Sequence, residues 1–140
     1  MRYMLDTNTC IYLIKHHPPE VKENLAAVPI GEVGVSTIVV AELRYGITQS
    51  TKRKHNEGAL NDFLDYVTVL DWPMKAAPEY GRIRSHLKKR GTPIGAMDLL
   101  IAAHAIILNT VLVTNNTREF CRVPKLKLEN WVNSPFSDGE

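Results

Sequence analysis

The segment Tyr3-Met4-Leu5-Asp6-Thr7-Asn8 decides how this chain begins to fold. Its apolar residues predict a short buried strand over residues 2–5, and residues 7–15 predict a helix that follows without a loop. Asp6 would therefore lie at the carboxyl end of a strand, where binding sites form in open α/β sheets. Its carboxylate has two interpretations at this stage. It caps the following helix, which is worth about 1 kcal/mol, or it belongs to such a site.

The rest of the chain continues this alternation of strands and helices. Further strands are expected over residues 33–35, 67–70, 110–114 and 127–129. Helices are expected over residues 18–27, 37–48, 53–66, 74–89 and 95–108, with one helical turn over residues 117–121. Such alternation favours an α/β fold with a mostly parallel sheet covered on both faces. We expect one domain over residues 1–132 and a disordered tail over residues 133–140, which hold Pro, Ser, Gly and acidic residues.

Composition excludes several classes of protein. The 140 residues carry a net charge of +2, with 44% hydrophobic and 23% charged residues, as in an ordinary globular protein. No signal peptide is evident, and no apolar run reaches the roughly 18 residues that a membrane span needs, so we expect a cytoplasmic protein with no membrane contact. Cys10 and Cys121 are isolated and lack zinc-site spacing. We expect both to be reduced thiols.

Basic residues gather in three short segments. The first is residues 75–90, where six Lys and Arg residues, among them Arg82 and Arg84, face only Glu79. The second is Lys52-Arg53-Lys54, and the third comprises Arg118, Arg122, Lys125 and Lys127. A local excess of this kind can follow a phosphate backbone. The alternative for each segment is a solvated helix face.

Four acidic residues lie in apolar settings although they are far apart in sequence: Asp6, Glu42, Asp98 and Glu119. A buried carboxylate without a partner is costly, so it normally finds a cation or takes up a proton. Mg²⁺ and Mn²⁺ prefer such oxygen ligands and can acidify a bound water for hydrolysis. Together the four residues predict a metal-dependent hydrolase of phosphodiesters, with RNA as the expected substrate.

Each of the other three carboxylates also has a simpler interpretation. Glu42 has no charged neighbour one helical turn away, but it could extend to solvent or pair with an Arg across the fold. Asp98 could stabilise its helix from the first turn, where the helix dipole favours an acidic residue, or it could form a capping box with Gly95. Glu119 could pair with Arg122. His104 does not share a helix face with Asp98, and we expect it to be a hydrogen-bonded core or interface residue.

Four segments in order resemble the PIN-domain ribonucleases, and within them the VapC toxins of toxin–antitoxin pairs. They span most of the chain: Met4-Leu5-Asp6-Thr7-Asn8, Ala41-Glu42-Leu43-Arg44-Tyr45-Gly46, residues 91–98 with 101–105, and residues 112–120. The resemblance implies a PIN-like three-layer α/β/α sandwich. It also implies that Asp6, Glu42, Asp98 and Glu119 bind Mg²⁺ or Mn²⁺ and activate water for RNA cleavage.

Further expectations follow from the same resemblance. Asn8, Thr114, Asn115, Arg82 and Arg84 would position the substrate. Many PIN domains carry Asp where this chain has Asn116, so the fourth acidic role would fall to Glu119. The family implies homodimers, a VapB-type antitoxin whose C-terminal segment blocks the site, and larger toxin–antitoxin assemblies. The residues around Asp98 and Glu119 are similar to those of enteric toxins that cut initiator tRNA in its anticodon loop.

Two other functions remain open from the sequence. A phosphatase could use Asp6 as its nucleophile, although Asn8 stands where such a motif needs a second Asp. A PIN-like domain could also act only as an inactive binding module, although all four carboxylates are present.

Overall fold

The computed structural model describes residues 1–132, so the predicted disordered tail lies outside the described residues. Its centre is a sheet of five parallel strands in the order β3-β2-β1-β4-β5. The strands are β1 (Tyr3–Leu5), β2 (Val33–Ser36), β3 (Thr68–Leu70), β4 (Val111–Val113) and β5 (Lys127–Glu129). The prediction of a mostly parallel sheet is confirmed.

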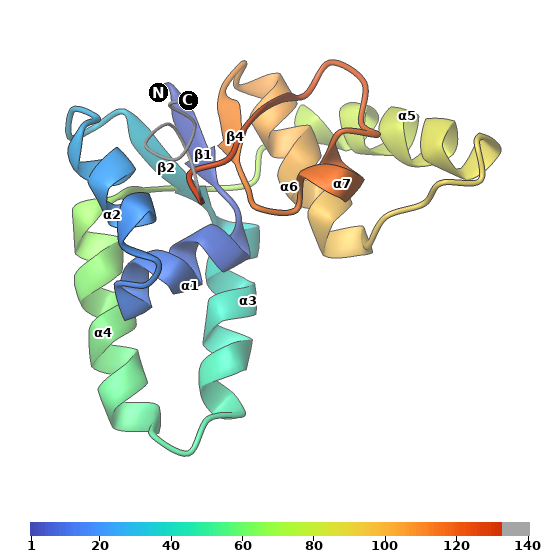
Figure 1. Ribbon diagram of the computed structural model, residues 1–140. Helices are drawn as coiled ribbons and strands as arrows, with labels where there is room; N and C mark the ends of the chain where they lie inside the picture. Colours follow the sequence, from blue (N-terminus) through green and yellow to red (C-terminus); the bar gives the residue numbers. More distant parts are fainter. Residues whose placement is uncertain (133–140) are drawn as a thin grey trace.

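Helices lie on both sides of this sheet (Figure 1). They are α1 (Thr7–Lys15), α2 (Pro19–Ala26), α3 (Thr37–Thr48), α4 (Arg53–Tyr66), α5 (Ala76–Lys89), α6 (Ala96–Ile107) and the short α7 (Thr117–Phe120). The chain adds strands first on one side of β1 and then on the other. Because crossovers between parallel strands are right-handed, reversing direction moves the helices to the opposite face. The three-layer α/β/α architecture follows from this rule.

The strand β1 lies in the middle of the sheet, between β2 and β4. Tyr3 pairs with Val33 on one side and Val111 on the other. All three residues of β1 are buried, and Met4 and Leu5 are fully so. The neighbouring carboxyl ends of β1 and β4 form the point at which the strand order changes direction, where open α/β sheets bind their ligands.

Local sequence signals set the helix ends. Ser36 caps α3, because its hydroxyl accepts a hydrogen bond from the Ile38 amide at 3.1 Å. The helix α5 begins at Ala76, two residues later than predicted, and stops before Gly91, whose φ of 71° suits glycine. The helices α3 and α4 form a hairpin that extends away from the sheet (Figure 1). Within residues 1–132, no helix is long and apolar enough to cross a membrane.

Candidate active site

Asp6 sits at the carboxyl end of β1 and is 4% exposed. One carboxylate oxygen, Oδ1, accepts a hydrogen bond from the Thr9 amide at 2.9 Å, and Oδ2 accepts one from the Thr114 hydroxyl at 2.5 Å. Thr114 follows β4 directly and is fully buried. Burial raises the pKa of Asp6, although these hydrogen bonds oppose the effect. Asp6 therefore caps α1 and also lies at the change of strand direction, so its two interpretations are compatible.

Glu42 reaches the same region from α3. Its side chain is half-buried, and Oε1 accepts a hydrogen bond from the Thr7 hydroxyl at 2.5 Å. Within residues 1–132, no Lys or Arg forms an ion pair with it. The alternative in which Glu42 pairs with an Arg across the fold is therefore wrong.

Asp98 lies in the first turn of α6, and its pKa is raised. Burial is the main cause, and the charges of Glu42, Asp6 and Glu119 add to it, so that the pKa rises from 3.8 to about 6. Glu42, Asp6 and Glu119 therefore lie within electrostatic range of Asp98, although they belong to different parts of the fold. The capping box expected with Gly95 does not form, because Asp98 accepts no hydrogen bond from the Gly95 amide within residues 1–132.

Glu119 lies on α7 and is half-buried. Its Oε1 accepts a hydrogen bond from the Asn116 side-chain amide at 2.9 Å. The alternative pairing with Arg122 is wrong, because that guanidinium donates to the Pro93 carbonyl oxygen at 3.3 Å. Asn116 thus holds the residue that would take the fourth acidic role.

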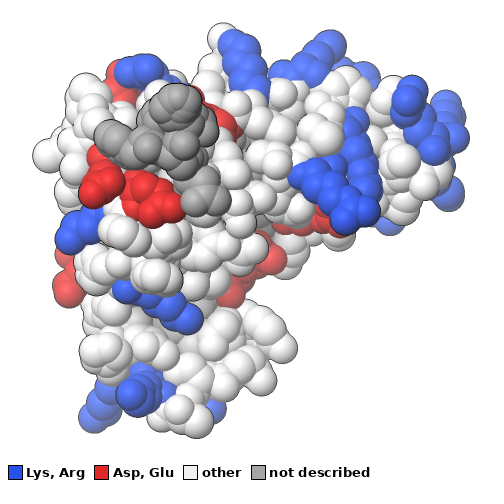
Figure 2. Space-filling model, viewed as in Figure 1, with Lys and Arg blue, Asp and Glu red and all other residues white. Residues whose placement is uncertain are grey.

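The four carboxylates share one electrostatic property: none forms an ion pair within residues 1–132, where the ion pairs are Met1–Glu32 and Arg82–Glu79. Grouped carboxylates without cations repel one another. In Figure 2 acidic side chains appear in the recess between the α3–α4 hairpin and the α5–α6 pair. The site has the oxygen donors and the excess negative charge that suit a divalent cation.

The geometry limits how such a cation is held. Among the residues that the structure describes, no three Asp, Glu, His or Cys side chains converge closely enough to form a metal site on their own. Mg²⁺ usually keeps several waters and takes only one or two carboxylates directly. The chemistry of the four residues fits this mode of binding, in which the more distant carboxylates would act through water.

The other predicted site residues differ in their exposure and in their hydrogen bonds. Asn8 is exposed, and its side chain makes no hydrogen bond within residues 1–132. Asn115 bonds Tyr12 and Asn130 rather than a carboxylate. Thr114 is the polar residue that directly supports Asp6.

The two arginines expected to position the substrate lie on α5. Arg82 forms an ion pair with Glu79, which is only 5% exposed, so its charge is largely compensated. Arg84 is exposed, lies over the Tyr80 ring at 5.9 Å and donates to the Tyr80 hydroxyl at 2.7 Å. Arg84 forms no ion pair within residues 1–132, so its charge is the freer of the two.

His104 corrects one prediction. It is 1% exposed in α6, but its Nδ1 has no hydrogen-bond partner in the described part of the chain. Burial lowers its pKa, which favours the neutral ring. His104 is thus a core residue, but Nδ1 lacks the hydrogen bond that we expected.

Sequence reasoning missed the neutral donors around the carboxylates. Thr7 and Asn116 each hold one acidic side chain by a hydrogen bond, and Thr9 supports Asp6 through its backbone amide. Thr7 directly follows Asp6, and Asn116 follows the predicted strand that ends near Thr114. The sequence signal that could have identified these donors is a polar residue close to the end of a predicted strand.

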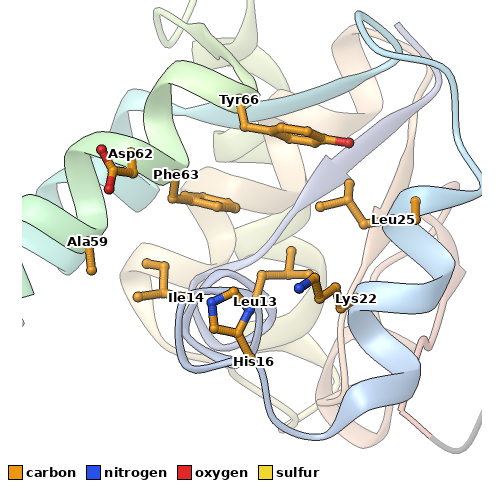
Figure 3. Close-up of a pocket in the computed structure, with 10 residues that line it drawn as sticks. Leu13, Ile14, His16, Lys22, Leu25, Ala59, Asp62, Phe63 and Tyr66 are labelled. Carbon is orange, nitrogen blue, oxygen red and sulfur yellow. The ribbon is translucent and has the colours of Figure 1, made fainter.

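Two apolar grooves border α1 and α4. The first has a volume of about 340 Å³ and lies between α1, α2 and α4, with Leu13, Leu25, Phe63 and Tyr66 around it (Figure 3). The second, of about 270 Å³, lies between α1, α3 and α4 and includes Glu42 in its wall. Ile14 lines both grooves, so they are adjacent.

Comparison with known proteins agrees with this architecture. The PIN domain family matches residues 3–126. Ribonuclease VapC2 of Rickettsia felis is 46% identical over 132 residues, which cover 94% of this chain and 98% of that protein. The tRNA(fMet)-specific endonuclease VapC of Salmonella typhimurium is 39% identical over 131 residues, covering 94% and 98%.

Solved structures show the same similarity. VapBC2 from Rickettsia felis, bound to a DNA fragment from its promoter, matches with a TM-score of 0.87 and 44% identity over 94% of this chain and 99% of that one. DNA-bound VapBC from Salmonella typhimurium matches with a TM-score of 0.88 and 39% identity, covering 94% and 98%. This chain belongs to the PIN-domain family, and its relatives within that family are VapC ribonucleases. The resemblance drawn from the four sequence segments is confirmed.

Proposed function

We propose that this chain is the toxin of a VapBC-type pair, an endoribonuclease that hydrolyses RNA phosphodiester bonds with Mg²⁺ or Mn²⁺ held by Asp6, Glu42, Asp98 and Glu119. PIN-domain ribonucleases generally depend on divalent metal ions. One observation carries the assignment of the site: Glu42, Asp6 and Glu119 lie close enough to Asp98 to raise its pKa. A bound divalent ion would supply the positive charge that acidifies water and stabilises the charged phosphate.

Individual residues of the chain have different roles at this site. Asp6 is fixed by two hydrogen bonds and gives the site a rigid acidic centre. Glu42 and Glu119 approach from α3 and α7, each held by a neutral donor, so neither is neutralised by a protein cation. The basic α5 would bind phosphates on either side of the cut, in the cytoplasm where RNA is found.

The first experiment compares the wild-type chain with Asp6→Asn on total cellular RNA, with Mg²⁺ and with EDTA. The amide has nearly the same shape, and it can still accept from Thr9 and donate to the Thr114 hydroxyl, so folding should persist. We expect discrete cuts that need both Asp6 and metal. Unchanged cleavage by the variant would contradict the assigned site, and cleavage in EDTA would remove the metal from the mechanism.

We further propose that the substrate is initiator tRNA, cut in its anticodon loop. The support is the 39% identical Salmonella typhimurium relative, which is named a tRNA(fMet)-specific endonuclease. A single-stranded loop suits sequence-specific cutting, because its bases can be unstacked and read. Mapping the cut ends by sequencing tests this. Intact initiator tRNA beside another cleaved RNA would contradict the target and leave the ribonuclease assignment in place.

The two adjacent apolar grooves suggest where a VapB-type antitoxin would bind. A segment that fills the groove between α1, α2 and α4 and passes over Ile14 enters the second groove and reaches Glu42. We expect Ala59→Arg, inside the first groove, to weaken neutralisation by the antitoxin. Glu57→Arg on the exposed face of α4 is the matched control. Equal neutralisation of both variants would place the antitoxin elsewhere.

The phosphatase and the inactive binding module give different outcomes in the same assays. Turnover of a small phosphomonoester with a phosphorylated Asp6 would support the phosphatase. RNA binding without cleavage, unaffected by metal and by Asp6→Asn, would support the binding module.

A further inference from the structure

The hydroxyl of Thr7 connects two helices at the candidate site. Thr7 is the first residue of α1, directly after Asp6, and its Oγ1 donates to Oε1 of Glu42 at 2.5 Å. Glu42 lies 35 residues later, on α3. This hydrogen bond is therefore a tertiary contact that ties the acidic residue of one helix to the N-terminus of another.

The contact joins a hydroxyl donor to a carboxylate acceptor. A hydroxyl that donates to an ionised carboxylate forms a bond of about 2.5–2.7 Å, which is stronger than one between neutral groups. Glu42 forms no ion pair within residues 1–132, and Oε2 accepts no hydrogen bond there. Thr7 is thus the group that orients this carboxylate, and it does so without neutralising its charge.

Orientation matters for Glu42 more than for Asp6. A glutamate side chain has three rotatable bonds, and this one is half-buried on a hairpin that extends away from the sheet (Figure 1). Without a donor it could turn into the apolar groove that it borders or toward solvent. Partners that hydrogen-bond a metal-ligating side chain commonly contribute about 10- to 100-fold to metal affinity or activity.

We propose that Thr7 is a positioning residue, which holds Glu42 by one oxygen and leaves the other oxygen to bind the water shell of a divalent cation near Asp6 and Asp98. This inference rests on the proposed metal-dependent function. The competing role is purely structural: Thr7 would only join α1 to α3 and would have no effect on metal binding.

Three variants separate these roles. Thr7→Val keeps the shape but removes the hydroxyl, and Thr7→Ser keeps the hydroxyl. Thr48→Val is the matched control, because it removes a hydroxyl that donates to the Tyr45 carbonyl oxygen near the far end of α3. For each protein we would measure the melting temperature in EDTA, its rise on adding Mn²⁺, the Mn²⁺ dissociation constant by calorimetry, and RNA cleavage.

We expect Thr7→Val to weaken Mn²⁺ binding about 10- to 100-fold and to reduce the metal-induced rise in melting temperature. Thr7→Ser and Thr48→Val should bind Mn²⁺ as the wild type does. An equal loss of melting temperature with and without metal, at unchanged affinity, would assign a structural role and overturn the proposal.

Two further results are also decisive. If Thr7→Val does not fold, Thr7→Ala takes its place, and failure of both to fold would again mean a structural role and overturn the proposal. If the wild type itself neither binds Mn²⁺ nor cleaves RNA, the proposed function fails. If the wild type does both and Thr7→Val matches it, only the inference about Thr7 fails.

Discussion

Asp98 differs from the other three acidic residues in the support that it receives. Thr114, Thr7 and Asn116 donate hydrogen bonds to Asp6, Glu42 and Glu119, respectively. Within residues 1–132, no side chain donates to Asp98, which is also surrounded by the other three charges. Its ionised form is therefore stabilised least by the protein, and a bound cation would stabilise it most.

The first prediction concerns the stability of Asp98→Asn. The pKa of Asp98 is raised from 3.8 to about 6 in the folded protein, so ionisation disfavours folding as pH rises through this range. The penalty is absent below about pH 4 and complete above about pH 6. Because the site is partly open to solvent, we expect the ionised Asp98 to lower the free energy of unfolding by only about 1–2 kcal/mol. In EDTA, urea unfolding at pH 7.5 should show the variant to be more stable than the wild type.

The same comparison at pH 4 provides the internal check. There the free energies of unfolding of wild type and Asp98→Asn should converge, and excess Mg²⁺ at pH 7.5 should remove the variant's advantage. Asp65→Asn, an exposed change on α4, is the control for removing one negative charge away from the site. A stability difference that is equal at both pH values would contradict the electrostatic explanation.

At the scale of elements, α5 carries a local excess of positive charge. Figure 2 shows Lys and Arg side chains over the α5 side of the molecule, across from the acidic residues. Its last turn carries Lys88 and Lys89, and Arg90 follows as the C-cap. Cations at a helix C-terminus also stabilise the helix, because they interact favourably with its dipole. A structural role for these residues therefore has to be separated from RNA binding.

The second prediction therefore replaces Lys88, Lys89 and Arg90 by Gln in the Asp6→Asn background, which should bind RNA without cutting it. Each phosphate contact to single-stranded RNA contributes about −0.7 to the slope of log affinity against log salt. We expect binding to weaken and the slope to become less steep by about 2. The control removes Lys52, Arg53 and Lys54 at the start of α4, far from α5 (Figure 1). An unchanged slope in the α5 variant would mean that this face is only solvated surface.

For the whole molecule, the excess negative charge of the site links metal binding to stability. An ion that binds only the folded state stabilises it by about 2.7 kcal/mol at 100 times its dissociation constant. The third prediction is that Mg²⁺ or Mn²⁺ raises the melting temperature at pH 7.5 and that EDTA reverses the rise. KCl at equal ionic strength is the control for screening. An equal rise in KCl would show that no specific ion site exists.

The fourth prediction concerns assembly. Several large apolar side chains are exposed on the single chain, with Met74 at 86%, Ile30 at 81% and Tyr45 at 67%. We expect a homodimer, with twice the chain mass of 15.8 kDa by light scattering. Adding antitoxin should produce a larger complex. A monomer at all concentrations would contradict the expected dimer.

Much of the element order could be predicted from the sequence, because short apolar runs, proline, glycine and capping residues act locally. The parallel strands, the caps at Asp6 and Ser36, and the stop of α5 before Gly91 agree with such signals. The start of α5 was placed two residues too early, since Met74 and Lys75 favour a helix as well as a turn. The hydrogen bond expected for His104 is missing at Nδ1, because nothing in the local sequence reports which groups surround a core residue.

The four acidic residues could be recognised one by one from the sequence, because a charge inside an apolar pattern stands out wherever it occurs. Only the tertiary structure decided that Asp6, Glu42 and Glu119 lie within electrostatic range of Asp98, since strand order and crossover handedness bring residues up to 113 positions apart into the same region. It also decided that Thr7 and Asn116, rather than Arg122 or another cation, hold two of them. Hydrogen bonds of this kind depend on where two elements end in space, which local sequence patterns do not encode.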